Sequence, residues 1–325
     1  EDTLSLHDAL PIFDVLYPEA HGAGLVGSSW AKHHHALAEF IAMFSPNSVL
    51  EIGGGHGILA LNYQSIATIP WIIVEPNPTP VEGCRAEIIR GFFDENFALP
   101  DDVDAIVHSH VFEHMYDPVK FMSHLAGFMA VGKKLIFSVP NMRVMMNRKY
   151  TNCLNFEHTI FLTEEYIEYL LAAHGFKVLE REYFLEDHSI FYAAVRDNNV
   201  ELATIPESLY TRNRDLYLAY VEDHKRLVRE ANKEIRGQSN VYLFGAHAQA
   251  QYLIGFGLET ESIVAILDND KNKHGKRLYG TEKFVFGPQN LAGKEKPIVI
   301  VRAGTFTQEI VEQIRSINPT ARFIL

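Results

Sequence analysis

Closely spaced glycines and a carboxylate follow a short apolar run near residue 50. The run Ser48–Ile52 contains Glu51 and is followed by Gly53, Gly54, Gly55 and Gly57. Glycines at these spacings let the backbone turn sharply and approach a ligand that a Cβ atom would block. A dinucleotide fingerprint would require glycine at position 58, where the chain has Ile58. The pattern therefore predicts a cofactor-binding loop and argues against NAD at this position.

A second carboxylate and several aromatic and polar residues follow the next apolar runs. Glu75 lies 18 residues after Gly57 and ends one such run, where its carboxylate could accept both hydroxyls of a ribose. Adjacent residues of an extended segment point in opposite directions, so we expect one of Phe92 and Phe93 to be core. The predicted cofactor-binding residues are Glu51, Gly53, Gly54, Gly55, Gly57, Glu75, Pro76, Phe92, Phe93, His108 and Ser109.

Histidines next to carboxylates could carry acid–base chemistry. His158 is our candidate general base, because an imidazole with a pKa of about 6.5 can accept a proton near neutral pH and the adjacent Glu157 could fix its tautomer. His110 is the alternate base. We expect four further residues on the substrate side of the pocket, namely Asn141, Asn155, His114 and Trp30.

The sixteen histidines also raise the possibility of a metal site. His108, His110 and His114 cluster with Glu113, but they span a strand end and a loop without the HExxH spacing. The triplet 33–35 falls in a helical pattern, in which consecutive side chains fan around the helix and cannot all face one ligand. We therefore expect solvated or helix-packing roles for the triplet and no metal.

The order of apolar runs predicts two α/β domains. Helical spacing over Ser29–Phe44 precedes strands at 48–52, 72–75, 105–108 and 134–139, and a helix at 163–174 precedes strand-like runs at 177–184 and 189–195. A long amphipathic helix is expected between 206 and 237, followed by parallel strands at 241–245, 263–268, 298–302 and 322–325. We divide the chain into an extension over 1–12 that is foreign or disordered, a domain over 13–200, a connecting helix over 201–237 and a smaller Rossmann-like domain over 238–325.

Composition and charge restrict the partners. The formal net charge is −12, which disfavours a nucleic-acid partner because phosphate binding needs a basic face. The two cysteines, Cys84 and Cys153, form no CxxC pair, and no apolar run is long enough to span a bilayer. We expect a cytoplasmic protein that acts on a small molecule, with neither nucleic acid nor membrane as partner. Nothing in the sequence indicates its oligomeric state.

The motifs VLEIGGGHG, IVEPNP, DAIVHSHVFEHMYDP, LIFSVPN and NFEHTIFLTEEYIEYLLAAHGF follow one another in order. They resemble the successive motifs of class I S-adenosylmethionine-dependent methyltransferases over residues 22–196. The segments VYLFGAHAQAQYLIGFGL and AILDNDKNKHGKRLYGT, and also GLVGSSWAKHH, resemble the deoxysugar C-methyltransferases. The resemblance implies a Rossmann-like sheet, S-adenosylmethionine as cofactor, S-adenosylhomocysteine as product and a nucleotide-linked keto sugar as acceptor.

The chain departs from that family at two points. The family's N-terminal zinc module with paired cysteines has no counterpart in this sequence. Its active-site stretch tyrosine-Asp-Glu-His corresponds here to Asn155, Phe156, Glu157 and His158, so the resemblance carries over the last two residues and not the tyrosine. O- or N-methylation of another metabolite is therefore an alternative.

Two further alternatives come from other classes of protein. Gly245, His247 and Ala250, with Asp268 further along the chain, form a degenerate dinucleotide fingerprint, which leaves an NAD-dependent oxidoreductase open. A cofactor-binding scaffold without catalytic activity is the alternative that is not an enzyme.

Overall fold

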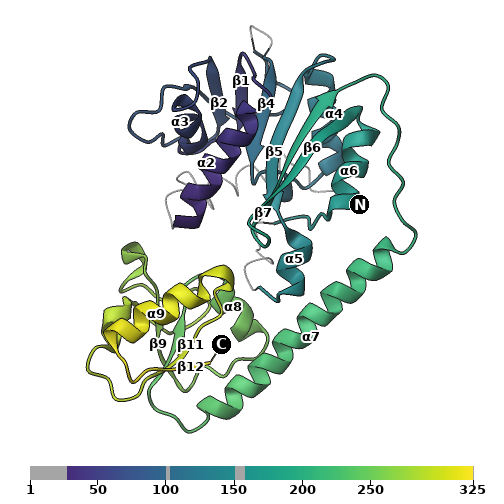
Figure 1. The fold of residues 1–325 in the computed structure, drawn as a ribbon. Helices are drawn as coiled ribbons and strands as arrows, with labels where there is room; N and C mark the ends of the chain where they lie inside the picture. The colour runs from purple at the N-terminus through teal and green to yellow at the C-terminus, as the bar shows by residue number, and fades with distance from the viewer. Residues whose placement is uncertain (1–27, 100–102, 151–157, 325) are drawn as a thin grey trace. The chain divides into compact units, whose positions relative to one another are not determined.

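The computed structural model describes residues 28–99, 103–150 and 158–324 (Figure 1). The chain forms two compact units, one made of residues 1–141 and 157–205 and the other of residues 142–156 and 206–325. The second unit thus includes a short segment that the sequence analysis placed within the first domain. The predicted extension over 1–12 lies outside the described residues.

The first unit is built on a seven-stranded sheet in the order β3-β2-β1-β4-β5-β7-β6. Strands β3, β2, β1, β4 and β5 pair in parallel, and β7 is antiparallel to both of its neighbours, β5 and β6. The strands are β1 (Val49–Ile52), β2 (Trp71–Glu75), β3 (Glu87–Arg90), β4 (Ala105–Ser109), β5 (Lys134–Pro140), β6 (Phe176–Phe184) and β7 (Ser189–Arg196). The central strands are buried along their length because helices cover both faces.

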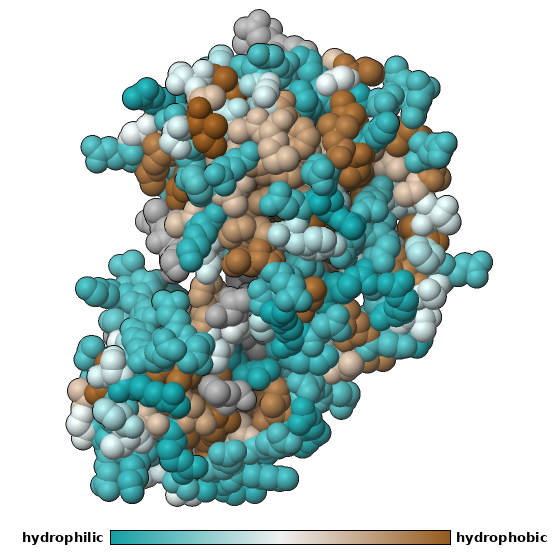
Figure 2. All heavy atoms as spheres, viewed as in Figure 1, coloured by the Kyte–Doolittle hydropathy of each residue, from teal (hydrophilic) through white to brown (hydrophobic). Residues whose placement is uncertain are grey.

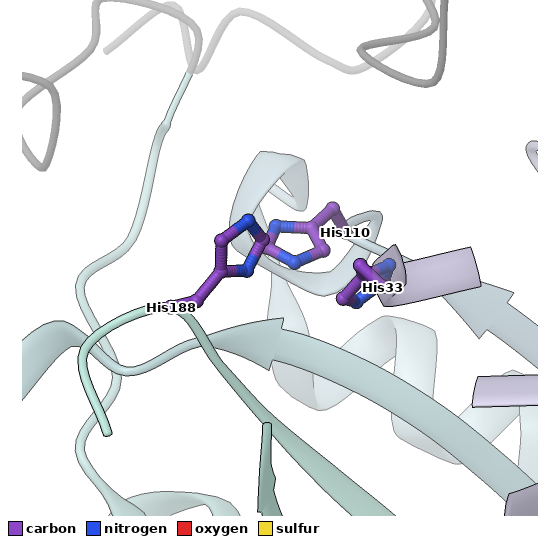
Figure 3. Close-up of side chains that lie close together, drawn as sticks. All are labelled: His33, His110 and His188. Atoms are coloured by element: carbon purple, nitrogen blue, oxygen red, sulfur yellow. The ribbon is translucent and has the colours of Figure 1, made fainter. Parts of the chain in front are cut away.

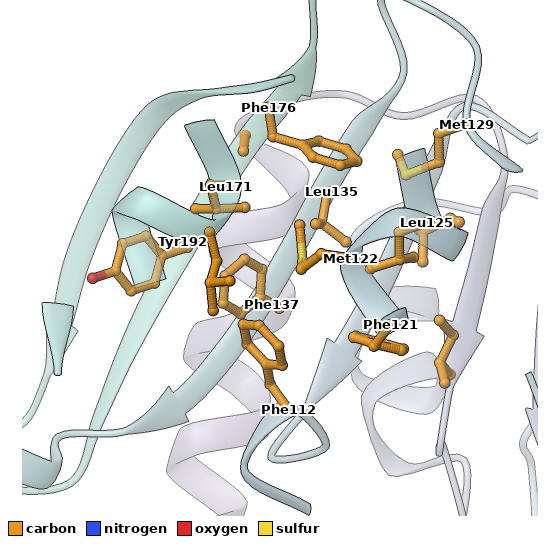
Figure 4. Packing of buried hydrophobic residues seen from close by; sticks show 14 of the residues in the cluster. Phe112, Phe121, Met122, Leu125, Met129, Leu135, Phe137, Leu171, Phe176 and Tyr192 are labelled. Carbon is orange, nitrogen blue, oxygen red and sulfur yellow. The ribbon is translucent and has the colours of Figure 1, made fainter. Parts of the chain in front are cut away.

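Two apolar clusters hold those helices on the sheet. On one face, α2 (Ser28–Ala42) and α3 (Ile58–Gln64) contribute Leu37, Ile41 and Leu59. On the other face, α4 (Pro118–Phe128) and α6 (Glu164–Ala173) pack onto β4, β5 and β7, and the close-up in Figure 4 shows this cluster. Local sequence fixes where α4 begins, because the Asp117 side chain accepts the Lys120 N–H at 2.9 Å.

The strand directions bring several loops to one edge of this sheet. The carboxyl ends of β1, β2, β4 and β5 lie there because these strands are parallel. Strand β7 begins at the same edge, where Ser189 pairs with Pro140 at the end of β5. The strand order reverses between β1 and β4, and ligands of open α/β sheets bind outside the carboxyl ends at such a point. A ligand-binding site is therefore expected at this edge of the sheet.

The second unit contains a five-stranded parallel sheet in the order β10-β9-β8-β11-β12. Its strands are β8 (Val241–Phe244), β9 (Ile263–Leu267), β10 (Val285–Phe286), β11 (Ile298–Ile300) and β12 (Arg322–Ile324). Helices α7 (Leu209–Ile235) and α8 (Ala248–Gly255) pack on one face, and α9 (Thr307–Ile317) packs on the other. The fold is therefore mixed α/β with two parallel-dominated sheets, as the sequence predicts.

The long helix α7 belongs to the core of the second unit. One face of it buries Tyr220, Val228 and Ile235, and Tyr220 packs on the methionines of α5 (Met142–Asn147). The Tyr220 hydroxyl also donates to the Tyr150 carbonyl at 3.0 Å. These contacts explain why residues from the middle of the chain belong to the second unit.

Short 3-10 helices complete the described structure at η2 (Phe112–His114), η4 (Lys271–Lys273), η5 (Pro288–Leu291) and η6 (Gly304–Phe306). Within the described ranges, none of the helices is both long and apolar enough to cross a membrane. Polar side chains cover much of the face drawn in Figure 2, with apolar side chains interspersed among them.

Candidate active site

The glycine loop turns immediately after β1. Gly53 and Gly57 have φ angles of 72° and 67°, a region that side chains rarely adopt. A Cβ atom at Gly57 would lie 2.6 Å from the Cys84 Sγ atom, and one at Gly54 would lie 2.8 Å from the Glu51 Cδ atom. Glycine is therefore required by the backbone conformation and by close packing, and the loop presents its main chain at the edge of the sheet.

Glu51 lies beneath this loop and does not point out of it. Its side chain accepts a hydrogen bond from the Trp71 indole at 2.8 Å, and the residue is 3% exposed. Burial raises the pKa of Glu51 to about 7, the Trp71 hydrogen bond opposes this shift, and the negative charge of Glu75 adds to it. We assign Glu51 a supporting role under the loop, in place of the direct cofactor contact expected from the sequence.

Glu75 is the last residue of β2, Pro76 follows it, and the Glu75 side chain lies beside the glycine loop. The Glu75 carboxylate accepts the Gly55 N–H at 3.3 Å and the Asn77 N–H at 3.1 Å. Pro76 is half-buried, and its carbonyl accepts from Arg90. The Glu75 carboxylate, which the sequence predicts to bind the ribose of the cofactor, thus lies next to the predicted cofactor-binding loop.

Two residues that follow β4 contact each other, namely His110 in the loop and Glu113 in η2. The His110 Nδ1 atom lies 3.0 Å from the Glu113 Oε1 atom, and the Glu113 side chain is 5% exposed. His110 has a φ angle of 53°, which is strained for a residue with a side chain and marks a position worth a functional explanation. Its other ring nitrogen, Nε2, lies 2.8 Å from the Ser189 hydroxyl.

His114 and His158 also lie close to Glu113. One carboxylate oxygen and one ring nitrogen from each histidine lie within 4.8 Å of one another. The segment after His158 is fixed to the same turn, because the N–H groups of Thr159 and Ile160 both donate to the Glu113 carbonyl. Burial alone would raise the pKa of Glu113, but the charges of His110, His114 and His158 and the His110 hydrogen bond outweigh it and lower that pKa to about 2.

A second group of imidazoles lies on the other side of His110. His33 on α2 and His188 before β7 both lie close to His110, and the rings of His33 and His188 are stacked with centroids 5.4 Å apart. Trp30 covers the group edge-on, with its ring centroid 4.9 Å from that of His110. Burial, and next the charge of His110, lowers the pKa of His188 to about 4, and the same causes lower the pKa of His33 well below its usual value.

Several predicted site residues are placed in the core instead. The His108 ring is 1% exposed and stacks on Phe137 at 4.8 Å, so it offers no free face to a cofactor. Phe93 packs against Phe128 and the core cluster, whereas Phe92 is 39% exposed. The His108 expectation is corrected because its strand position points the ring into the apolar layer under α4.

Asn141 and Ser109 occupy positions at the sheet edge. The Asn141 side chain is buried and donates to the Glu186 carbonyl at 2.9 Å, and its backbone N–H donates to the His188 carbonyl. We therefore correct its predicted substrate contact to the support of the turn that carries His188. Ser109 is half-buried, with its hydroxyl 3.4 Å from that of Ser138. Glu157 and Asn155 lie outside the described residues.

In the second unit, the Asp268 carboxylate of the degenerate fingerprint contacts neighbouring residues of the same unit. Asp268 after β9 accepts the Ala246 N–H at 2.7 Å and the Asp270 N–H at 2.8 Å, and Lys273 pairs with it at 3.2 Å. His247 is the N-cap of α8 and accepts from the Gln249 N–H. These contacts place the Asp268 carboxylate beside the loop after β8.

Family models identify the chain. A methyltransferase domain matches residues 28–181, and a C-methyltransferase C-terminal domain matches residues 208–325. These ranges contain the glycine loop, the Glu113 group and the second sheet. The chain belongs to the S-adenosylmethionine-dependent methyltransferases of the class I fold that carry a C-methyltransferase C-terminal domain.

No curated protein matches the chain. Solved structures resemble it at low identity. Magnesium protoporphyrin IX methyltransferase from Synechocystis PCC 6803, with bound SAH, is 15% identical, with a TM-score of 0.41 over 52% of this chain and 84% of that one. Mitomycin 7-O-methyltransferase is 18% identical, with a TM-score of 0.40 over 52% of this chain and 56% of that one. An S-adenosylmethionine-dependent methyltransferase from Clostridium acetobutylicum ATCC 824 is 12% identical, with a TM-score of 0.40 over 59% of this chain and 99% of that one. The substrates in these names belong to those proteins.

Proposed function

We propose that this enzyme methylates a carbon atom beside the keto group of a nucleotide-linked sugar, with His158 as the general base. The observation that carries the proposal is the buried Glu113 carboxylate, which lies beside His158 at the loop edge of the first sheet. The C-methyltransferase C-terminal domain supports a carbon acceptor, and the resemblance to deoxysugar C-methyltransferases supports the sugar.

The residues of the first unit fit S-adenosylmethionine. The glycine loop packs so closely on Glu51 and Cys84 that it has no room for Cβ atoms at Gly54 and Gly57, and Glu75 presents a carboxylate beside it. We propose that Gly53, Gly55 and Glu75 hold the adenosine and methionine parts of the cofactor. When bound, S-adenosylmethionine supplies an electrophilic methyl group on a sulfonium, whose departure as a neutral thioether needs alignment more than acid catalysis.

The acceptor carbon must lose a proton before it can attack. A hydrogen on carbon beside a ketone is weakly acidic, and an imidazole can remove it near neutral pH. His158 would take this proton, and the electron pair of the C–H bond would move into an enolate, whose carbon could then accept the methyl group that bound S-adenosylmethionine would supply. Glu113 stabilises the protonated imidazole, and the role predicted for Glu157 falls on a residue outside those that the structure describes. His110 is less suited as the base because both its ring nitrogens have partners.

Hydrogen–deuterium exchange separates this reaction from its alternatives. The enzyme is incubated in D₂O with S-adenosylhomocysteine and a nucleotide-linked keto sugar, and exchange beside the ketone is followed by NMR. We expect exchange in the wild type and none above background in His158→Ala. With S-adenosylmethionine present, mass spectrometry and NMR locate the methyl group. An O-methyl or N-methyl product would overturn carbon methylation, and exchange that persists in His158→Ala would overturn the assignment of the base.

A further inference from the structure

Three imidazole rings converge from three separate elements in the first unit. His33 comes from α2, His110 from the loop after β4 and His188 from the turn before β7, and Figure 3 shows the three rings together. One ring nitrogen of each lies within 4.8 Å of the other two. His33 is fully buried and His188 is 7% exposed. Imidazoles gathered in this way form a ligand set of the kind that transition metals prefer.

Neighbouring serines hold the rings of His33 and His188 by one nitrogen each. The His33 Nε2 atom lies 3.0 Å from the Ser138 hydroxyl, and the His188 Nδ1 atom lies 2.7 Å from the Ser189 hydroxyl. The buried Nδ1 atom of His33 has no hydrogen-bond partner. A buried ring nitrogen without a partner is costly and calls for an explanation. A metal ion would supply the missing partner.

Glu113 orients the third ring as a carboxylate does in many metal sites. It contacts the Nδ1 atom of His110 at 3.0 Å, which leaves the Nε2 atom as the ligand nitrogen; that atom now lies 2.8 Å from the Ser189 hydroxyl, which a bound ion would replace. Metal-bound histidines usually have such a carboxylate or carbonyl on their second nitrogen, which fixes the tautomer and increases ligand basicity. The buried negative charge of Glu113 would also offset part of the charge of an ion bound through neutral ligands.

We propose that His33, His110 and His188 form a binding site for one divalent transition-metal ion, with Zn²⁺ and Co²⁺ as suitable ions. Zinc lies about 2.0–2.1 Å from histidine nitrogens, so binding draws the three rings inward from their present separations. Three protein ligands leave a further coordination position for water or substrate. This site replaces our expectation from sequence that no metal is bound, and it stands independently of the proposed methyl transfer.

Cobalt and zinc binding to the whole chain tests the site. The metal-free protein is titrated with Co²⁺ alone and followed by visible absorption, and Zn²⁺ content is measured after dialysis against ZnCl₂. We expect one equivalent of either ion and the intense visible bands of four-coordinate cobalt. His188→Ala and His33→Gln should each weaken binding by about 100-fold or more, since even outer residues of metal sites contribute about 10- to 100-fold.

Two control variants locate the ion. His35→Ala removes an exposed histidine from the same helix, paired only with Glu39 at 3.5 Å, and should keep full binding. His158→Ala removes a histidine from the neighbouring group of Glu113, His114 and His158, and this variant should also bind the metal ion as the wild type does. Circular dichroism shows whether each variant is folded. No saturable binding in the wild type, or binding lost in His158→Ala and kept in folded His188→Ala, would overturn the proposal.

Discussion

The Nδ1 atom of His110 lies 3.0 Å from the carboxylate of Glu113, and this pair joins two groups of histidines at one edge of the sheet. On one side are His114 and His158, and on the other are His33 and His188. The buried Glu113 carboxylate can therefore stabilise a protonated His158 and at the same time orient the His110 ring. This arrangement makes Glu113 the most informative residue to change.

Replacement of Glu113 by glutamine should lower kcat by about 100-fold, because the neutral amide keeps the shape of the side chain but no longer stabilises a protonated imidazole. The acidic limb of the kcat profile should move to lower pH for the same reason. Affinity for S-adenosylmethionine, measured by calorimetry, should change little. Glu39→Gln on the exposed side of α2 serves as the control. An unshifted pH profile would show that Glu113 acts only on structure.

His158→Ala should lower turnover by about two orders of magnitude or more, with little change in cofactor affinity, since a positioned base contributes about 10²- to 10⁴-fold. Steady-state kinetics with labelled S-adenosylmethionine measure this effect. The exposed His35→Ala variant should keep wild-type turnover. A His158→Ala enzyme as active as the wild type would require another base, and His110 would be the first to test.

Local patterns in the sequence predicted most of the fold. The apolar runs around Val49 and Val241 and the periodic spacing of α7 are properties of neighbouring residues, so the strands and the long helix could be placed from them. The glycine loop was predictable for the same reason, because its spacing reflects a turn at one place in the chain. The weaker elements, such as the two-residue strand β10 and helix α5, left no comparable pattern.

The site was harder to predict because it depends on contacts between distant residues. The hydrogen bond between Ser138 and His33 spans 105 positions, and the one between His110 and Ser189 spans 79. The sequence showed His33 only as part of a triplet, and it gave no sign of His188. Glu113 stood in a visible cluster of histidines, yet its link to His158 arises from backbone pairing of Thr159 with the Glu113 turn.

Gly57→Ala should destabilise the first unit by about 1–3 kcal/mol, because the residue adopts a φ angle of 67° and the new Cβ would lie 2.6 Å from the Cys84 Sγ atom. It should also weaken cofactor binding by displacing the loop. Denaturant unfolding can be followed by tryptophan fluorescence, since both tryptophans, Trp30 and Trp71, belong to the first unit.

Gly91→Ala is the matched control for this glycine. No heavy atom lies within 4 Å of a Cβ atom at position 91, and its φ angle is not in the left-handed region. We expect a change within about 0.5 kcal/mol there. The double variant Gly57→Ala with Cys84→Gly removes the clash but keeps the strained φ angle, so it should recover only part of the loss. Equal stability of Gly57→Ala and the wild type would contradict the strained conformation.

Glu51→Gln should remove a pH dependence of stability. Burial raises the pKa of Glu51 to about 7 in the folded chain, against 4.5 when exposed. Between these two values the folded state holds a proton that the unfolded state has lost, so the free energy of unfolding falls as pH rises from 4.5 to 7 and levels off above. At about 1.4 kcal/mol per pKa unit, the wild type should lose roughly 3 kcal/mol relative to Glu51→Gln across this range.

This difference can be measured by denaturant unfolding without cofactor at several pH values, with tryptophan fluorescence again reporting on the first unit. The comparison with Glu51→Gln cancels the titration of other carboxylates, because both proteins share them. Glutamine can still accept the Trp71 indole hydrogen bond, so the variant isolates the charge. Parallel stability curves for the two proteins between pH 4.5 and 7 would mean that Glu51 titrates normally, and therefore that water reaches the carboxylate beneath the glycine loop.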